Sequence, residues 1–220
     1  MSYLLLILIA YSTLSAIEYQ DVAHLSELSS PPQGCRYFDF IGGTKGIRCF
    51  IAPQDMSRTQ FIEENEALLD PCLTPIYKNA GITIKQDASF PVPGFYIVAP
   101  IQPYRSLDTV DEITHLRMFF LLREIRRAMR DVLGIEYAHV YYEEKADKSC
   151  NVHYWILPIH DIKKYPRIYN FDVLKYLEQF NYQDNHIKIK EFNNKLKRYI
   201  EKSCLVERDN QLINLLKGNL

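Results

Sequence analysis

The sequence predicts an α+β fold in which an antiparallel sheet carries one long helix. Two strand-like runs, 81–86 and 95–99, flank a turn with two prolines, which is typical of a hairpin with a long loop. Residues 109–134 repeat apolar side chains at helical spacing, and two further strand-like runs follow at 137–142 and 149–160. The order hairpin, long helix, strand, turn, strand is therefore the predicted frame of the molecule.

The charge balance and the cysteine content limit the kinds of partner and site that the chain is expected to have. Among 220 residues, 26 basic and 27 acidic side chains nearly cancel, so charge predicts neither a nucleic-acid nor a membrane partner. Five scattered cysteines contain no CxxC pair, so we expect no metal site, and no motif indicates a cofactor. Wide spacing and an odd count favour reduced thiols, with a Cys35–Cys49 disulfide left open.

The N-terminus leaves the compartment open. Residues 4–11 form an apolar run that is too short to span a membrane but has the length of a signal-peptide core. No basic residue precedes the run, and cleavage after Ala16 would place bulky Leu14 where a small residue is wanted. The alternatives are an exported protein and a cytoplasmic one whose N-terminal element docks on the domain.

Polar residues 17–34 indicate a linker, and a hairpin is expected after it. Its strands are 36–41 and 47–51, joined by the glycine-rich turn 42–46, which lacks the following helix of a phosphate loop. A helix is expected over 54–69, ended by the Asp-Pro step.

The long helix has start and stop signals. Thr109 and Glu112 form a capping box, and Gly134 ends the helix. Its basic side chains are interpreted as a solvated face: Arg117, Arg123, Arg126, Arg127 and Arg130.

Two further helices are expected at 171–180 and 187–204, the second strongly basic. This basic helix is interpreted as a docking helix with a solvated face, and an RNA-binding surface is the alternative. The predicted division is an apolar segment and linker at 1–34, a domain at 35–165 and a helical extension at 166–220.

The strand at 149–160 is the candidate functional element. Alternation puts Asn151, His153 and Trp155 on one face and apolar neighbours on the other. A row of hydrogen-bonding groups on a rigid strand suits a phosphate or a base. The alternative is a buried strand whose single histidine is satisfied by a backbone carbonyl.

Three motifs resemble the histidine-triad (HIT) superfamily of nucleotide hydrolases and transferases. Residues 90–100, Phe-Pro-Val-Pro-Gly-Phe-Tyr-Ile-Val-Ala-Pro, are similar to its Pro-Gly-His-x-Leu-Val-x-Pro segment. The run 104–108 before the long helix is similar to the stretch that follows. Residues 151–158, Asn-Val-His-Tyr-Trp-Ile-Leu-Pro, are similar to the signature His-x-His-x-His-x-x-Pro. The resemblance implies a HIT-like antiparallel sheet with one long helix and terminal extensions.

The resemblance also implies site roles. His153 matches the nucleophilic middle histidine, oriented by a backbone carbonyl, while Asn151 and Trp155 replace the flanking histidines and Phe95 replaces the one after the glycine. Asn151 and Trp155 can donate hydrogen bonds to phosphate but cannot supply a proton. His139 and His160 are alternative acids.

Substrate contacts are implied at two further places. Glu143 or Glu144 matches a ribose- or phosphate-contacting position, with an exposed turn carboxylate as the alternative. Asp87 matches a sugar-contacting position, with a turn-forming aspartate as the alternative. The expected function is nucleotide phosphohydrolysis or nucleotidyl transfer through His153, on a nucleotide or dinucleoside polyphosphate. The alternative is a catalytically impaired nucleotide- or protein-binding module, and either form is expected to allow a homodimer.

Overall fold

A computed structural model describes most of the chain. The described residues are 19–22, 24–43, 46–56, 58–144, 152–163 and 172–219. The apolar N-terminal run and Asn151 lie outside these ranges, so the signal-peptide interpretation and the expected role of Asn151 stay predictions.

The central element is a five-stranded sheet in which every neighbouring pair is antiparallel. The sheet confirms the α+β class and the predicted 81–99 hairpin, whose strands pair from Ile82 opposite Pro100 to Gln86 opposite Tyr96. In spatial order its strands are β4 (Tyr77–Asn79), β5 (Ile82–Gln86), β6 (Tyr96–Pro100), β8 (His153–Pro158) and β7 (Ala138–Glu143).

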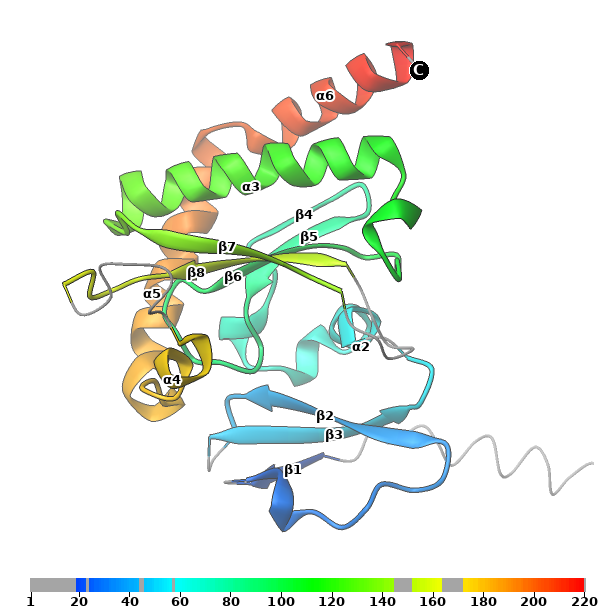
Figure 1. Cartoon of the computed structure of the whole chain (residues 1–220), viewed down its shortest axis with the longest axis vertical. Helices are drawn as coiled ribbons and strands as arrows, with labels where there is room; N and C mark the ends of the chain where they lie inside the picture. The colour runs from blue at the N-terminus through cyan, green and yellow to red at the C-terminus, as the bar shows by residue number, and fades with distance from the viewer. Residues whose placement is uncertain are drawn as a thin grey trace, which may run out of the picture.

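The long helix α3 (Glu112–Leu133) covers one face of this sheet (Figure 1). It begins one turn later than expected, because Asp111 rather than Thr109 caps it by accepting a hydrogen bond from Thr114 N at 2.9 Å. The predicted Thr109–Glu112 box is wrong: Thr109 ends the short 3₁₀ helix η5 (Leu107–Thr109). Gly134 ends α3 as expected, in the left-handed conformation at φ +68°.

Strand alternation divides the sheet into two faces. Buried apolar side chains turn toward α3 and α5 (Tyr182–Lys202) and form the main core with them. The sheet contributes Ile82, Ile84, Tyr96, Val98, Tyr154 and Ile156 to this core. The residues between them, including Lys85, Ile97, His153 and Trp155, belong to the opposite face, so the predicted separation of His153 and Trp155 from Tyr154 and Ile156 is confirmed.

A second sheet lies across from that opposite face (Figure 1). Its strands β1 (Tyr19–Val22), β3 (Ile47–Pro53) and β2 (Cys35–Ile41) are antiparallel in this order, and β2–β3 is the predicted hairpin. Residues 19–22 are therefore strand rather than linker, because β1 supplies partners for the outer edge of β3. The short 3₁₀ helix η2 (Leu25–Glu27) follows β1.

This second sheet has its own aromatic core. Phe38, Phe40, Phe50 and Phe61 pack together with ring centroids 5.3–6.3 Å apart. Phe61 comes from α2 (Arg58–Glu64), which is much shorter than the helix expected over 54–69 and is followed by η3 (Glu66–Leu68) and η4 (Pro71–Leu73). Cys35 and Cys49 are both free thiols, so the disulfide alternative is excluded for this pair.

The C-terminal segment is helical, as expected, and contains three helices among the described residues. They are α4 (Val173–Leu177), α5 and α6 (Leu205–Asn219), and α6 packs along α3 (Figure 1). Within the described ranges, no helix combines the length and apolar character needed to cross a membrane. The predicted division of the chain into segments 1–34, 35–165 and 166–220 stays a prediction.

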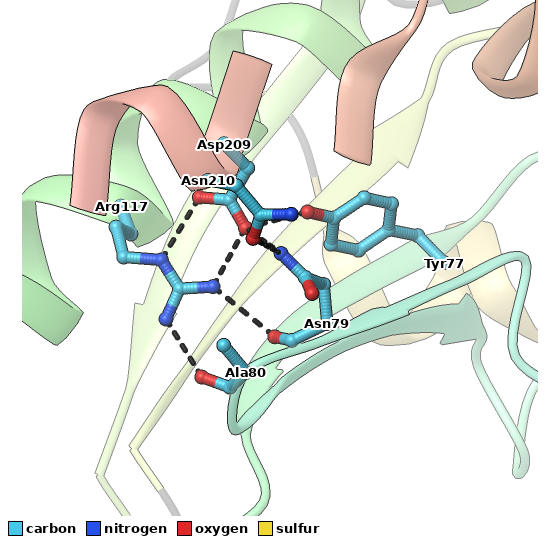
Figure 2. A network of polar contacts seen from close by, with 6 residues as sticks. All are labelled: Tyr77, Asn79, Ala80, Arg117, Asp209 and Asn210. Carbon is cyan, nitrogen blue, oxygen red and sulfur yellow. Dashed lines mark hydrogen bonds and ion pairs between the residues drawn. The ribbon is translucent and has the colours of Figure 1, made fainter. Parts of the chain in front are cut away.

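A buried ion pair fixes α6 to the sheet (Figure 2). Arg117 of α3 donates to both carboxylate oxygens of Asp209, at 2.8 Å and 2.6 Å, and to the carbonyls of Asn79 and Ala80. Tyr77 and Asn79 also donate to Asp209. Arg117 is therefore an exception to the expected solvated arginine face, since its side chain is only 3% exposed.

Asp209→Ala should destabilise the protein by about 3–5 kcal/mol, because it leaves the Arg117 charge buried without a partner. Asp131→Ala, which removes an exposed pair with Arg130, is the matched control and should cost at most about 1 kcal/mol. Urea unfolding of both variants measures the difference. Equal stabilities would contradict the role given to Asp209.

The Asp209 carboxylate should also make the stability of the fold depend on pH in the acid range. Burial raises the pKa of Asp209, but hydrogen bonds from Arg117, Tyr77 and Asn79 outweigh this and lower it. A depressed folded pKa means that the stabilisation is complete above the ordinary range near pH 4 and is lost as the pH falls through the folded pKa. Asp209→Asn should therefore show a weaker loss of stability on acidification than the wild type.

Candidate functional site

A cavity of about 460 Å³ lies between the two sheets. Its floor is the face of the central sheet that α3 does not cover, and its opposite wall is formed by β2 and α2. The polar and charged side chains that line it are Arg36, Tyr37, Asp39, Arg58, Lys85, Asp87, Ser89, Glu143, His153 and Trp155. The sequence-predicted site residues His153, Trp155, Glu143 and Asp87 are thus brought together at one cavity.

Strand register sets the positions on the floor. Lys85 pairs with Ile97, and Ile97 pairs with Trp155, so these three form one row across β5, β6 and β8. His153 pairs with Glu143 of β7 in the next row. Directly paired residues have neighbouring side chains on one face of the sheet, so the register brings His153 and Glu143 together.

The imidazole of His153 is held beside a carboxylate. Its Nε2 lies 2.8 Å from Oε2 of Glu143, and its side chain is 10% exposed. A carboxylate at one ring nitrogen favours the proton there and leaves the basic lone pair on the other nitrogen. This contact was not among those expected, because the resemblance implied a backbone carbonyl as the group that orients the ring.

Glu143 and Glu144 have different surroundings, which separates the two candidates named from the sequence. Glu144 does not line the cavity. It accepts a hydrogen bond from Leu107 N at 2.8 Å and another from the hydroxyl of Tyr142. Only Glu143 is therefore in a position to meet a ligand of the cavity.

Trp155 lies beside His153, with ring centroids 6.1 Å apart. Its indole packs edge-on against Phe95 at 5.3 Å and against Phe90 at 6.5 Å. In the described part of the chain its indole N–H is buried and has no hydrogen-bond partner. Trp155 therefore lines the cavity beside His153, and the expected donation of its N–H to a phosphate stays a prediction.

The segment before β6 depends on Gly94. Its φ is +84°, and an added Cβ would lie 2.8 Å from Cδ1 of Ile135 and 3.4 Å from the ring of Phe192. A side chain at this position is excluded both by backbone conformation and by space. Phe95 then enters the core at 0% exposure, at the position where the family motif has a histidine.

Asp87 serves the turn between β5 and β6. Its Oδ1 accepts hydrogen bonds from Ser89 N at 2.8 Å and Phe90 N at 2.7 Å, which is the turn-forming role considered from the sequence. Burial raises the pKa of this carboxyl, although the two N–H donors and the charges of Arg58 and His153 oppose the effect. Contact with a sugar stays a prediction.

Sequence analysis did not identify the cavity wall that β2 and α2 form, or the role of Arg58 in it. Arg58 donates to Asp39 Oδ1 at 3.0 Å and to Ser89 Oγ at 2.9 Å, and it lies 4.4 Å from the centre of the Phe40 ring. Arg58 thus connects the second sheet to the turn that holds Asp87. No local pattern identifies this contact, since it joins residues 31 positions apart.

Lys85 was also missed. It is 4% exposed on the cavity floor, and burial lowers its pKa to about 7, with a further lowering from the charge of Arg58 and an opposing effect of Asp87. A signal was present, because Lys85 and Thr83 alternate with the apolar residues Ile82 and Ile84. That pattern turns Lys85 away from the core of α3.

The two alternative acids do not reach the cavity wall. His160 Nε2 lies 2.8 Å from the carbonyl of Pro93, and burial lowers the pKa of His160. His139 stacks on Tyr141 and its pKa is likewise lowered by burial. Neither belongs to the cavity lining. Among the described residues, no group of three or more His, Cys, Asp or Glu side chains is arranged to hold a metal ion.

Comparison with known proteins gives structural likeness only. No family model matches the sequence, and no curated protein matches it. A Hit-like protein involved in cell-cycle regulation from Bartonella henselae is 18% identical, with a TM-score of 0.40 over 61% of this chain and 95% of that one. A hypothetical histidine triad nucleotide-binding protein from Sulfolobus tokodaii is 15% identical, with a TM-score of 0.45 over 64% and 93%.

The NitFhit protein of C. elegans is a third similar structure, at 14% identity and a TM-score of 0.36. The match covers 72% of this chain but only 33% of that protein. The names of the first two structures are those of the superfamily that the sequence motifs resemble. At such identities the likeness concerns the fold alone.

Lys85 predicts an unusual dependence of stability on pH. The folded pKa is about 7 against an ordinary 10.5, so the unfolded chain holds more protons between these values. Stability should therefore rise with pH across this range, with a slope of up to about 1.4 kcal/mol per pH unit. Lys85→Met should remove the rise and stabilise the protein most below pH 7.

Urea unfolding between pH 6 and 9 measures this slope. Lys78→Met is the matched control, because Lys78 lies on neighbouring β4 with its side chain 51% exposed. An identical slope in the wild type and Lys85→Met would show that the Lys85 ammonium is solvated in the folded protein.

Proposed function

We propose that this chain is a HIT-like nucleotide phosphohydrolase or nucleotidyltransferase that acts through His153. The observation that supports it most is the imidazole beside an open cavity with Glu143 on one ring nitrogen. The cavity volume of about 460 Å³ falls in the range that holds a small-molecule ligand. The motif at 151–158 supplies the family resemblance, and a nucleotide or dinucleoside polyphosphate is the proposed ligand.

In the proposed reaction, the unprotonated ring nitrogen of His153 attacks the α-phosphorus of the nucleotide. An N–P bond forms and the P–O bond to the leaving group breaks. Water, or an acceptor hydroxyl in a transferase, then attacks the same phosphorus and releases His153. Glu143 stabilises the ring while it carries positive charge in this intermediate.

The leaving group of this reaction needs a proton. Neither Asn151 nor Trp155 can supply one, and the absence of a positioned acid typically costs about 10²–10⁴ in rate. Substrates whose leaving group is already a good one, such as phosphoanhydrides, avoid that cost. The proposal therefore favours anhydrides over alkyl phosphate esters.

A catalytically impaired binding module is the second candidate. The loss of both flanking histidines favours it, as does the fact that neither His139 nor His160 lines the cavity. It predicts that the chain binds members of a panel of dinucleoside polyphosphates and nucleotide sugars without turning them over. The same panel tests both candidates, with binding by calorimetry and turnover by product analysis.

His153→Ala should abolish turnover of any active member of the panel, because it removes the nucleophile. The matched control is His115→Ala, since His115 lies on α3 and stacks on Phe119, away from the cavity. Product formation by liquid chromatography measures both variants. Unchanged turnover in His153→Ala would remove the enzymatic proposal.

A homodimer is proposed on a separate observation. Strand β7 is an edge of the central sheet, and exposed apolar side chains gather on it and on neighbouring α3. Unpaired edge strands with such side chains are sites of association. The residues are Val140 and Tyr142 of β7, Tyr137 just before it, and Leu116 and Phe119 of α3.

Val140→Lys should therefore convert a dimer to a monomer, because it places a charge in the proposed interface, where the Val140 side chain is 46% exposed. Sedimentation velocity measures the change. Leu174→Lys, at a 68%-exposed leucine of α4, is the control and should leave the dimer intact. A monomeric wild type at every protein concentration would contradict the dimer.

A further inference from the structure

The Lys85 amine lies buried beside the cavity. It is 4% exposed on β5, and in the described part of the chain no hydrogen bond or ion pair to its ammonium group is present. Burying an unpaired charge costs free energy, and an apolar residue of similar length would remove that cost. The fold therefore does not need a lysine at this position.

The carboxylates around the cavity have other partners. Asp39 accepts from Arg58 at 3.0 Å, and Oδ1 of Asp87 accepts two backbone N–H groups. Glu143 lies 2.8 Å from His153. Among the described residues none of these contacts is an ion pair with Lys85, which leaves its amine available to an anionic ligand of the cavity.

Lys85 and His153 face the same space. Two strand spacings across the sheet and two residues along β8 separate them, which puts their Cα atoms roughly 12 Å apart. Both side chains line the same cavity. A ligand of nucleotide size spans such a distance, so one molecule can contact both groups.

We propose that Lys85 binds a second phosphate group of the substrate, next to the phosphate that His153 attacks, and takes up a proton as that group binds. This inference rests on the proposed function and narrows its substrates to compounds with at least two linked phosphates. The proton comes from solvent and returns to solvent when the ligand leaves. Covalent chemistry at Lys85 is not required.

Proton uptake follows from the surroundings of the amine. Burial lowers the pKa of Lys85 to about 7, so the amine is mostly neutral above that pH until an anion stabilises its charged form. Several other charged or titratable groups line the cavity and contribute to the field at Lys85: Arg36, Tyr37 and Asp39 of β2, Arg58 of α2, Asp87 after β5, Glu143 of β7 and His153 of β8.

The test uses inorganic pyrophosphate as the probe, in titration calorimetry with the full-length protein. Above pH 7 the ratio of wild-type to Lys85→Met affinity should fall about tenfold per pH unit, as the protonated fraction of Lys85 falls. Dividing by the variant's affinity removes the titration of pyrophosphate itself. Lys78→Met, at the exposed lysine of β4, is the control and should follow the wild type.

Buffers of different ionisation enthalpy give the number of protons taken up. At pH 8, pyrophosphate binding should take up close to one more proton in the wild type than in Lys85→Met. Equal affinities, pH slopes and proton uptake in the two proteins would overturn the inference, as would a wild type that does not bind pyrophosphate. If Lys85→Met fails to fold, Lys85→Gln takes its place.

His153→Ala separates this inference from the proposed catalysis. If Lys85→Met loses the pH slope while His153→Ala keeps full turnover, the anion site stands and the catalytic proposal fails. If His153→Ala loses turnover while Lys85→Met binds pyrophosphate like the wild type, the catalytic proposal stands and the role of Lys85 fails.

Discussion

The structure depends on the antiparallel pairing of β8 between β6 and β7. This pairing fixes Trp155 opposite Ile97 and Tyr141, and His153 opposite Glu143. A slip of one residue would turn His153 into the core of α3 and bring Tyr154 to the cavity. The apolar contacts of Tyr154 and Ile156 with that core oppose the slip. Packing on one face of β8 thus holds the chemistry on the other.

The two faces of the central sheet have different covers. Helices α3 and α5 seal one face with apolar side chains, whereas the N-terminal sheet and α2 approach the other and leave a charged cavity. The N-terminal sheet brings Asp39, and α2 brings Arg58, to a site whose other groups come from the central sheet. The contact of Arg58 with Ser89 joins these parts at the turn that carries Asp87. Strand β2 and helix α2 therefore form part of the cavity wall.

The two buried basic side chains, Arg117 and Lys85, have different electrostatic surroundings. Arg117 is surrounded by Asp209 and two backbone carbonyls, so its charge is compensated within the protein and anchors α6. No described residue forms an ion pair or hydrogen bond with Lys85, and burial lowers its pKa to about 7 despite the opposing charge of Asp87. A compensated buried charge serves stability, whereas an uncompensated one beside a cavity points to a ligand.

Much of the fold was contained in local patterns. Alternation identified the β5–β6 hairpin and the two faces of β8, because a strand in a half-buried sheet must separate apolar from polar side chains. Helical spacing and Gly134 identified α3 and its end. The cap at Asp111 was missed, since Thr109 and Glu112 offered an equally good local pattern and the preceding 3₁₀ turn decided between them. The early strand β1 was missed because its polar residues become strand only when β3 offers them partners.

The sequence alone determined that His153 lies on the polar face of a strand, because alternation is a local property of the backbone. Only the tertiary structure decided which groups meet it there. Glu143 rather than Glu144 reaches the ring, Arg58 reaches the cavity from α2, and Lys85 becomes buried on the cavity floor. Burial and long-range contact follow from how the two sheets pack, and no pattern within a single segment contains that information.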